Sequence, residues 1–593
     1  MEFVAYTEKW KKLTENHLMK ELLKYLKNYK KESLLAPLFK MLEAAFDLMV
    51  PLVVASIIDK GIRNGDIAYI WKMGGVLLLL AFVGLAFSIT AQFFAAKAAA
   101  GFGTELRHAL FKHIQEMSYS QLDKQGTSTL ITRMTSDVNQ VQAQVNMAIR
   151  LLLRSPFIVV GAMIMAFMVD SKTAVVFAVA IPLLSVIVYG IMLITIPLYK
   201  KVQIALDKVM GTTRENLSGV RVIRAFNQED EELERYSVEN QILNKFQIFA
   251  GRISTIMNPA TYIVINIAIV AILWAGGKRV DTGYLTQGEV VALVNYMSQI
   301  LIELIKLASL IINLTKAFAC ANRIKDIFNI KSGMSEGTLL KGENDNVAVE
   351  LINAGLVYDD AGEESITDIS FKALKGQTIG VIGGTGSGKT TLVNMIARFY
   401  DATSGEVKVN GTNVQEYKIE SLRNMIGVVP QKALLFKGTV RSNLMWGNEN
   451  ATEEDLTDAL KMSQSYDFVM EKEDGLDTEV AQNGKNFSGG QRQRLTIARA
   501  LVRKPEILIL DDSSSALDYA TDAKLRSDIR QLKNTTLFVV SQRTTSIMDA
   551  DKIIVLDDGQ AAGIGTHDEL MEKCEVYKEI YESQFKQAEK EAM

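Results

Sequence analysis

The segment QTIGVIGGTGSGKT, residues 377–390, joins a short β-prone run to the start of a helix-prone stretch. Its second half matches the glycine-rich phosphate-binding loop, in which backbone N–H groups surround phosphate oxygens at the N-terminus of a helix. In such a loop Lys389 places a cation at the β- and γ-phosphates, and the Thr390 hydroxyl is a ligand for Mg²⁺. The residues expected to contact nucleotide here are Gly383, Gly384, Thr385, Gly386, Ser387, Gly388, Lys389, Thr390 and Thr391. The segment therefore predicts an α/β domain that binds a nucleotide.

Two further motifs downstream are expected to complete this site. The apolar run 507–510 ends in Asp511 and Asp512, and a buried strand can deliver such a carboxylate to Mg²⁺ at the carboxyl edge of a sheet. We expect Asp511 to be the metal ligand. Ser488, Gly489, Gly490 and Gln491 open a helix with apolar periodicity, and its N-terminal N–H groups attract anions. The second half of the chain thus predicts binding of ATP with Mg²⁺.

The first half of the chain is far more apolar than the second. A membrane-spanning helix needs about 20 mainly apolar residues. Six segments meet this requirement: 34–58, 73–95, 151–169, 174–198, 253–275 and 290–314. The fold class predicted is a six-helix, all-α transmembrane domain followed by an α/β phosphate-loop domain. The net charge of −3 argues against nucleic acid as a partner.

Changes in composition along the chain set the expected boundaries. Residues 1–32 read as an N-terminal extension with an interfacial helix at 18–29, and not as a signal peptide, because no short apolar core with a cleavage site follows the lysines. The transmembrane domain is expected at 33–331, a polar linker at 332–346 and the nucleotide-binding domain at 347–593. A basic N-terminus inside the cell and six spans place the nucleotide-binding domain in the cytoplasm, which predicts a multi-pass plasma-membrane protein.

The motifs also occur together in a specific order. Along the chain they are Tyr358, the phosphate loop, Gln431 after Pro430, the 488–491 signature, Asp511 and residues 515–518. This order, preceded by six spans, resembles half-transporters of the ATP-binding cassette (ABC) exporter type, over nearly the whole chain. The resemblance implies that Tyr358 stacks on adenine, that Gln431 senses Mg²⁺ and the attacking water, and that Asp518 contacts the opposite domain.

The same resemblance implies a dimer in which each ATP lies between one chain's phosphate loop and the other chain's signature. It also implies two coupling segments that link the domains. The long connections after the second and fourth spans are helix-prone and carry Lys and Arg, and we expect the coupling segments at 118–124 and 216–221. An outward flip of the transmembrane helices would then follow closure of the nucleotide-binding domains.

Two positions depart from the ABC exporter pattern at the catalytic site. Asp512 stands where the family has a glutamate, and its side chain is one methylene shorter. A general base must lie about 2.6 to 3.2 Å from the water that it activates, and a misplacement of about 1 Å costs on the order of a hundredfold in rate. Gln542 replaces the family's histidine, and an amide cannot carry a proton. The candidate catalytic residues are therefore Asp512, Gln542 and Gln431, in a site expected to hydrolyse ATP slowly.

The signature of this chain, in contrast, is nearly intact. Because the two departures affect the chain's own ATP site and the signature serves the partner's site, we expect a heterodimer with a second half-transporter that has the glutamate and the histidine. Bacterial heterodimeric multidrug exporters resemble this arrangement. The expected substrates are hydrophobic or amphipathic compounds. Alternatives are a lipid or peptide exporter of the same architecture, a homodimer, and a membrane protein that uses ATP as a conformational latch without transport.

Charged residues inside the spans are candidates for the substrate path. Lys40 and Glu43, and likewise Glu303 and Lys306, are spaced to neutralise each other along one helix. Asp47 has no cation close in sequence, which makes it the better candidate for lining a cavity. The methionines of the third and sixth spans suit promiscuous binding but more often pack in a core or against lipid; they are Met163, Met165, Met168 and Met297.

Overall fold

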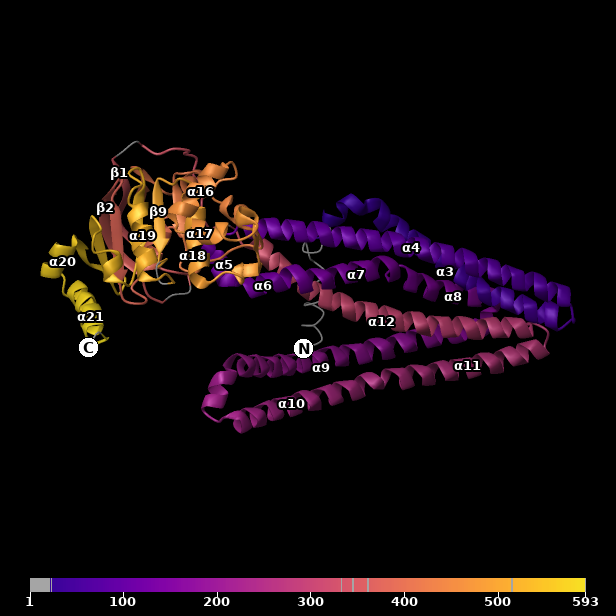
Figure 1. The fold of residues 1–593 in the computed structure, drawn as a ribbon. Coiled ribbons are helices and arrows are strands. Elements are labelled where there is room, and N and C mark those ends of the chain that lie inside the picture. Colours follow the sequence, from indigo (N-terminus) through magenta and orange to yellow (C-terminus); the bar gives the residue numbers. More distant parts are fainter. Residues whose placement is uncertain are drawn as a thin grey trace. The chain divides into compact units, whose positions relative to one another are not determined.

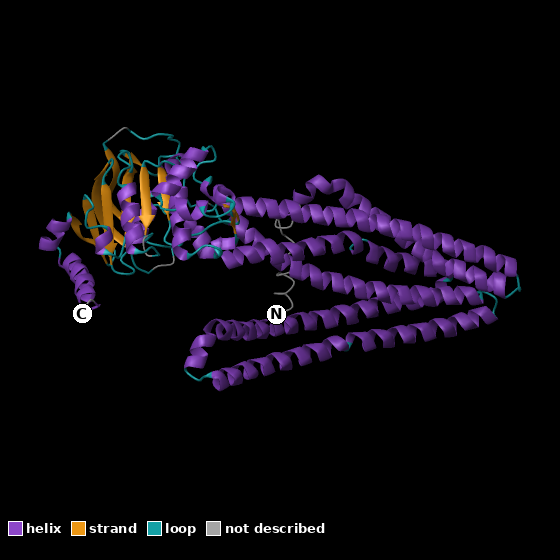
Figure 2. Ribbon diagram, in the orientation of Figure 1, coloured by secondary structure: helices purple, strands orange, loops and turns teal. Residues whose placement is uncertain are grey.

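The computed structural model describes residues 22, 24–331, 333–343, 346–359, 362–513 and 516–591, with side chains as far as residue 584. They form two units (Figure 1): the chain up to Gln115 together with Ser128–Ile330, and Glu116–Thr127 together with the chain from Lys331. The described part of the first unit is helical, and the strands lie in the second (Figure 2). Residues 18–21 and 23 of the interfacial helix expected at 18–29 lie outside the described residues, and Lys24–Tyr29 forms the 3₁₀ helix η1.

Six helical stretches in the described residues are long and apolar enough to cross a membrane, which confirms the predicted number of spans. In chain order they consist of η1, α3 (Lys30–Ser56) and the π-helical η2 (Ile57–Ile62); α4 (Ile67–Gln115); α6 (Thr127–Thr132), the π-helical η3 (Arg133–Asp137), α7 (Val138–Leu151) and α8 (Arg154–Val169); α9 (Ser171–Ala225); α10 (Glu229–Thr255) and α11 (Met257–Asp281); and α12 (Gln287–Asn329). The 55 residues of α9 span roughly 80 Å, more than twice the hydrocarbon core of a bilayer of about 30 Å. The longest helices must therefore continue well outside the membrane.

The apolar core of the first unit is centred on α12. Leu293, Tyr296, Met297 and Ile300 follow a helical spacing, are fully buried, and belong to one core cluster with residues of α3, α8, α9 and α11. The Tyr296 hydroxyl donates a 2.7 Å hydrogen bond to the carbonyl of Leu48, so this buried polar group is satisfied. The burial of Met297 assigns it to packing.

The charged residues singled out in the first and sixth spans form one connected network between α3, α8 and α12. Lys40 lies 2.5 Å from Glu43, and Lys306 lies 2.9 Å from Glu303, as their spacing predicts. Asp47 has no cation close to it in sequence, but the fold supplies one, because Arg154 of α8 contacts Asp47 at 3.0 Å. Arg154 also lies 2.6 Å from Glu303, whose other oxygen accepts a hydrogen bond from Ser155. The partner of Asp47 comes from a different helix, which spacing along one helix cannot reveal.

The second unit is built on a six-stranded sheet with the order β12-β11-β3-β10-β9-β6. Its strands are β3 (Thr378–Gly383), β6 (Ile426–Val429), β9 (Ile507–Asp511), β10 (Thr536–Val540), β11 (Lys552–Asp557) and β12 (Gln560–Gly565); the first five are parallel and β12 is antiparallel. In β9, Leu508 and Leu510 belong to one core cluster, and Ile507 and Ile509 to another. The strand is buried on both faces, as a parallel sheet requires.

The remaining elements of the second unit surround this sheet. A four-stranded antiparallel sheet has the order β2 (Ile366–Leu374), β1 (Val347–Leu356), β4 (Ser404–Val409) and β5 (Thr412–Asn413), and β7 (Gly438–Thr439) pairs with β8 (Glu479–Val480). The helices are α5 (Tyr119–Gln125), α13 (Lys389–Ile396), α14 (Ile419–Met425), α15 (Val440–Leu444), α16 (Glu453–Met462), α17 (Tyr466–Met470), η4 (Gly475–Asp477), η5 (Gln482–Gly484), α18 (Gly489–Val502), α19 (Tyr519–Ile529), η6 (Thr544–Ser546), α20 (His567–Lys573) and α21 (Glu575–Glu591). Helix α5 belongs to this unit although α4 and most of α6 belong to the other.

Candidate nucleotide-binding site

A cavity of about 230 Å³ lies at the carboxyl ends of β3, β9 and β10. Because these strands are parallel neighbours, the loops that follow them converge at one edge of the sheet. The residues that line the cavity are Ser365, Thr385, Gly386, Gly388, Lys389, Thr390, Thr391, Gln431, Asp511, Asp512, Val540 and Gln542. The phosphate loop, both aspartates, Gln431 and Gln542 therefore meet at one place. Ser365 carried no motif that could have identified it from the sequence.

The loop between β3 and α13 has a backbone that favours glycine. Gly386 and Gly388 have φ values of +86° and +90°, in the region that side chains with a Cβ rarely adopt. A Cβ on Gly388 would lie 2.6 Å from the carbonyl oxygen of Ser365, whereas a Cβ on Gly386 would meet nothing within 4 Å. The loop is thus tightly packed on its inner side and open at Gly386, where a ligand can approach the backbone.

Lys389 occupies the first position of α13 and folds back over the loop. Its amine donates hydrogen bonds to the carbonyl of Gly383 at 3.0 Å and to the carbonyl of Gly384 at 2.5 Å. Burial lowers the pKa of Lys389, and the charges of Asp511 and Asp512 oppose that effect. The amine is held by neutral carbonyls, and a phosphate group would be a stronger acceptor for it.

Thr390 and Asp511 form the part of the cavity suited to a divalent cation. The Thr390 hydroxyl donates a 3.1 Å hydrogen bond to Oδ1 of Asp511. Asp511 is the last residue of β9 and is buried, and burial raises the pKa of its carboxyl group. A carboxylate that loses its hydration in this way gains from a bound cation, because the cation replaces the lost solvation. The donor set of Thr390, Asp511 and Gln431 fits Mg²⁺, which prefers oxygen ligands.

Asp512 and Gln542 face the same cavity from adjacent strands. The Asp512 amide donates a 3.0 Å hydrogen bond to the carbonyl of Val540, which joins the ends of β9 and β10. The Asp512 carboxylate accepts a 3.3 Å hydrogen bond from Nε2 of Gln431. Gln542 follows β10, is exposed, and is one of the residues that line the cavity. Asp512, the candidate base, and Gln542, which replaces the family's histidine, therefore both line the cavity in which a nucleotide phosphate would lie.

The aromatic residue expected to stack on adenine is tied to α5. Tyr358 makes an edge-to-face contact with Tyr400 at 5.0 Å between ring centroids, and its hydroxyl lies 3.1 Å from that of Thr391. The Tyr400 hydroxyl donates a hydrogen bond to Asp123 in α5. Next to Tyr358, the carboxylate of Asp359 accepts a 2.8 Å hydrogen bond from Ser120, also in α5. The expected first coupling segment, 118–124, thus begins at the N-cap Ser118 and coincides with most of this helix.

The signature residues do not line this cavity. Ser488 is the N-cap of α18 and its hydroxyl accepts a hydrogen bond from the amide of Gln491, in a capping box. Gly489 and Gly490 form the first turn, so their N–H groups lie at the positive end of the helix. Asp518 caps α19 by accepting a hydrogen bond from the amide of Thr521. Residue 515, the first of the 515–518 motif, lies outside the described residues.

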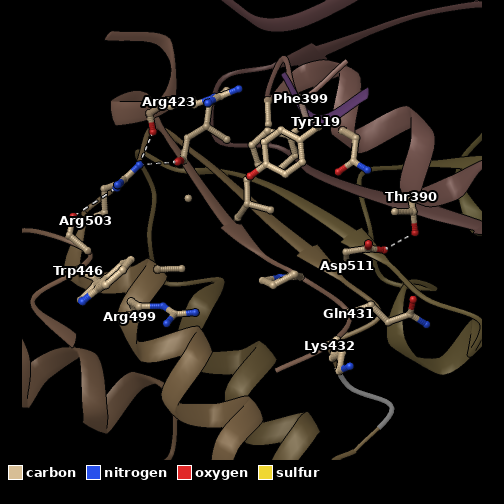
Figure 3. Close-up of a pocket in the computed structure, with 18 of the residues that line it drawn as sticks. Tyr119, Thr390, Phe399, Arg423, Gln431, Lys432, Trp446, Arg499, Arg503 and Asp511 are labelled. Carbon is tan, nitrogen blue, oxygen red and sulfur yellow. Dashed lines mark hydrogen bonds between the residues drawn. The ribbon is translucent and has the colours of Figure 1, made fainter. Parts of the chain in front are cut away.

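A second, larger hollow of about 650 Å³ adjoins the nucleotide cavity and shares Thr390, Gln431 and Asp511 with it. Figure 3 shows aromatic rings and arginines around it, among them Tyr119 of α5, Phe399, Arg423, Trp446, Arg499 and Arg503. The Tyr119 ring stacks on that of Phe399, with centroids 4.5 Å apart. Trp446 stacks on Phe436 and remains 61% exposed. We call this hollow the aromatic groove.

Sequence comparisons identify both halves of the chain. The ABC transporter transmembrane region family matches residues 33–304, and the ABC transporter family matches residues 366–515. An uncharacterized ABC transporter ATP-binding protein of Mycobacterium tuberculosis is 37% identical over 573 residues, which cover 96% of this chain and 98% of the relative. The chain belongs to the ABC transporter family.

Other relatives extend this result. A putative multidrug export ATP-binding/permease protein of Bacillus subtilis is 32% identical to this ABC transporter over 584 residues, 95% of this chain and 99% of the relative. An ATP-dependent lipid A-core flippase of Syntrophus aciditrophicus is 29% identical, over 82% of this chain and 80% of the relative. The fold matches that of a solved structure, a bacterial Atm1-family ABC exporter determined with ATP bound. The TM-score is 0.78 and the sequence identity 21%, over 94% of this chain and 98% of the exporter chain. Six spanning helices and one ATP-binding domain make the chain an ABC exporter half-transporter.

Proposed function

We propose that this ABC exporter chain is one half of a heterodimer, that its own ATP site hydrolyses slowly, and that the complex exports hydrophobic or amphipathic compounds. The observation that carries the proposal is the position of Asp512 and Gln542 in the same cavity as Lys389, Thr390 and Asp511. Both residues that depart from the family pattern, Asp512 and Gln542, therefore line the cavity in which the phosphates of ATP would bind. ATP would be held by the loop amides and Lys389, and Mg²⁺ by Thr390, Asp511 and Gln431, where it would neutralise phosphate charge.

The backbone supports the view that Asp512 is adapted to its place. Its φ is +45°, a left-handed conformation that Asp adopts more readily than most residues with a Cβ. Oδ2 of the Asp512 carboxylate accepts a hydrogen bond from Gln431, so a water molecule would share this oxygen with the Gln431 amide. A short carboxylate in this position would orient a water poorly, because general-base catalysis depends on contact distance.

Repair of the two positions tests the proposal. Asp512→Glu combined with Gln542→His should raise the ATPase rate of the purified full-length chain by on the order of a hundredfold, since about 1 Å of base placement is worth that much. The matched control is Asp558→Glu with Gln560→His, at the exposed turn between β11 and β12, where Asp558 has a φ of +43°. This control should leave the rate unchanged. A native chain that alone hydrolyses ATP as fast as the repaired chain would contradict the slow-site proposal.

The partner half would complete both ATP sites. The Ser488–Gln491 turn does not line this chain's own cavity, which is consistent with its serving the phosphate loop of the partner. A homodimer would have two weakened sites and would gain from the repair at both. A partner with glutamate and histidine would make the mixed complex faster than either chain alone, and comparison of the three rates separates the two assemblies.

The C-terminal end of α9 and the N-terminal end of α10 have apolar and acidic residues that would complement the aromatic rings and arginines of the aromatic groove. Figure 1 shows the last turns of α9 curving away from its long axis before α10 begins. The expected second coupling segment, 216–221, lies in this curved end, where Leu217, Val222 and Phe226 are exposed. The first turn of α10 is acidic throughout, and the groove contains three arginines. We propose that the groove receives this end of the partner chain.

Transport and orientation complete the proposal. The nucleotide-binding unit and the N-terminus would face the cytoplasm, where ATP is present, with the spans in the plasma membrane. Export is tested by ATP-dependent uptake of a lipophilic cationic dye into sealed inside-out vesicles that contain the complex. Uptake of a fluorescent phospholipid instead of the dye would favour the lipid exporter, which the flippase among the relatives makes the second candidate. ATP binding without movement of any compound would favour the conformational latch.

A further inference from the structure

The side-chain amide of Gln584 in the C-terminal helix α21 forms three hydrogen bonds to the loop that follows β10. Its Oε1 accepts from the Thr544 amide at 3.0 Å and from the Thr544 hydroxyl at 2.9 Å. Its Nε2 donates to the backbone carbonyl of Gln542 at 2.7 Å. One side chain outside every ATP-binding motif therefore holds both ends of the segment 542–544.

The position of Gln584 is itself fixed by the packing of α21. Tyr577 is fully buried, and its hydroxyl lies 2.8 Å from Nδ1 of His567 in α20. Ile580 packs against the core of the second unit. Residues 577, 580 and 584 are three and four positions apart, so they lie on one face of the helix. The anchored first turns of α21 carry Gln584 to the loop.

The loop depends on these contacts because it has buried polar groups. Thr544 is fully buried, and a buried donor that loses its partner costs free energy. On the other side of the segment, the amide of Arg543 donates a 2.9 Å hydrogen bond to the Ser541 hydroxyl, and its guanidinium lies 4.9 Å from the centre of the Tyr519 ring. The side chain of Gln542 begins at this segment, and Gln542 is one of the residues that line the nucleotide cavity. The reach of that side chain is set by where its backbone is held.

We propose that Gln584 is a positioning residue for Gln542, so that α21 sets the geometry of the ATP site through the backbone of residues 542–544. This inference rests on the proposed placement of a phosphate beside Gln542. It gives the C-terminal helix a role in ATP turnover that does not require it to touch nucleotide. Displacement of α21 would release the carbonyl of Gln542 and move the residue at position 542 away from the phosphate.

Gln584→Glu is the most informative variant. Glutamate has the same shape and can still accept both hydrogen bonds from Thr544, but its second oxygen faces the Gln542 carbonyl and cannot donate when ionised. In the full-length repaired chain, with Asp512→Glu and Gln542→His, we expect Gln584→Glu to lower kcat about fivefold, the effect of one lost hydrogen bond. The KM for ATP should change less than about twofold, because the phosphate loop is untouched. The thermal unfolding midpoint should stay near that of the repaired chain.

Ser583→Glu is the matched control, because it adds the same charge at the exposed neighbouring position of α21. It should leave kcat unchanged. An unchanged kcat in Gln584→Glu, or an equal loss in Ser583→Glu, would overturn the inference, as would a loss of kcat that only follows a lower unfolding midpoint. If the repair itself fails to raise the rate, the slow-site proposal fails, and the same comparison of Gln584→Glu with Ser583→Glu in the native chain still decides the role of Gln584.

Discussion

The hydroxyl of Tyr400 donates a hydrogen bond to the carboxylate of Asp123, across 277 positions of the sequence. Tyr400 also contacts the ring of Tyr358, which is expected to stack on adenine. Burial and the hydrogen bond to Asp123 both raise the pKa of Tyr400, so the phenol stays protonated and remains a donor at neutral pH. A single side chain thus links the expected adenine position to α5.

Tyr400→Phe should uncouple transport from ATP hydrolysis. The phenylalanine ring keeps the contact with Tyr358, but the hydrogen bond to α5 is lost. We expect dye uptake per ATP hydrolysed to fall at least about tenfold, because one hydrogen bond to a charged acceptor contributes about 1.5 to 3 kcal/mol. Affinity for ATP should stay within about twofold of the native chain. Tyr466→Phe in α17 is the control for loss of a phenol, and a matching loss there would contradict the assignment.

Trp446→Ala should weaken coupling at the aromatic groove. Trp446 is exposed in this chain and stacked on Phe436, as expected for an aromatic anchor that a partner covers. Truncation of such an anchor costs on the order of 2 kcal/mol of association, or about thirtyfold in affinity. We expect ATP-driven uptake by the complex to fall strongly while ATP binding is retained. The exposed Trp71 at the start of α4 provides the control, and Trp71→Ala should have little effect.

Arg154→Met should destabilise the first unit. Arg154 contacts Asp47 and Glu303, and Glu303 is only 3% exposed, so the variant leaves buried negative charge with less compensation. Removal of one partner from a buried ion pair costs about 3 to 5 kcal/mol. Thermal unfolding of the chain in detergent should show a lower midpoint, and a second change, Glu303→Gln, should restore much of the loss. Lys306→Met, at the half-exposed end of the network, should cost about 1 kcal/mol or less.

Asp511→Asn should separate stability from nucleotide binding. Burial raises the pKa of Asp511 above its ordinary value of 3.8, so the folded chain favours the protonated carboxyl. The contribution of Asp511 to stability is therefore largest below that ordinary value and is lost as pH rises through the raised pKa. At neutral pH the neutral amide should raise the unfolding midpoint of the nucleotide-free chain. Mg²⁺-ATP should raise the unfolding midpoint of the native chain but not that of Asp511→Asn. An unfolding midpoint of nucleotide-free Asp511→Asn below that of the nucleotide-free native chain would contradict this prediction.

The six spans and the phosphate loop could be predicted from sequence because each depends on local pattern. Apolar runs of sufficient length define a span, and the spaced glycines before Lys389 define the loop. The ends of the helices could not be predicted in the same way, because α9 continues through polar residues far beyond its apolar run. Its length is set by the hairpin that it forms with α10, whose residues pack against it.

Contacts between distant segments were beyond a local pattern. The cation for Asp47 is on another helix, Tyr400 meets α5 from the other half of the chain, and Gln584 reaches the loop after β10 from a helix without a motif. None of these partner residues lies in a sequence motif that would single it out. Only the fold brings the pairs together, so sequence reasoning could identify the nucleotide site but not the residues that hold it in place.

Helix α5 is made early in synthesis, yet the surface on which Tyr119 and Asp123 rest is made only after all six spans are complete. Contacts between segments so distant along a chain form late in folding. The ATP-binding domain therefore completes its fold only when it packs against α5, a helix that was synthesised much earlier, between the second and third spans. A fragment that starts at the linker would lack α5, so Phe399 and Tyr400 would lose their contacts with Tyr119 and Asp123. We expect such a fragment to be less soluble and to bind ATP more weakly than the intact chain.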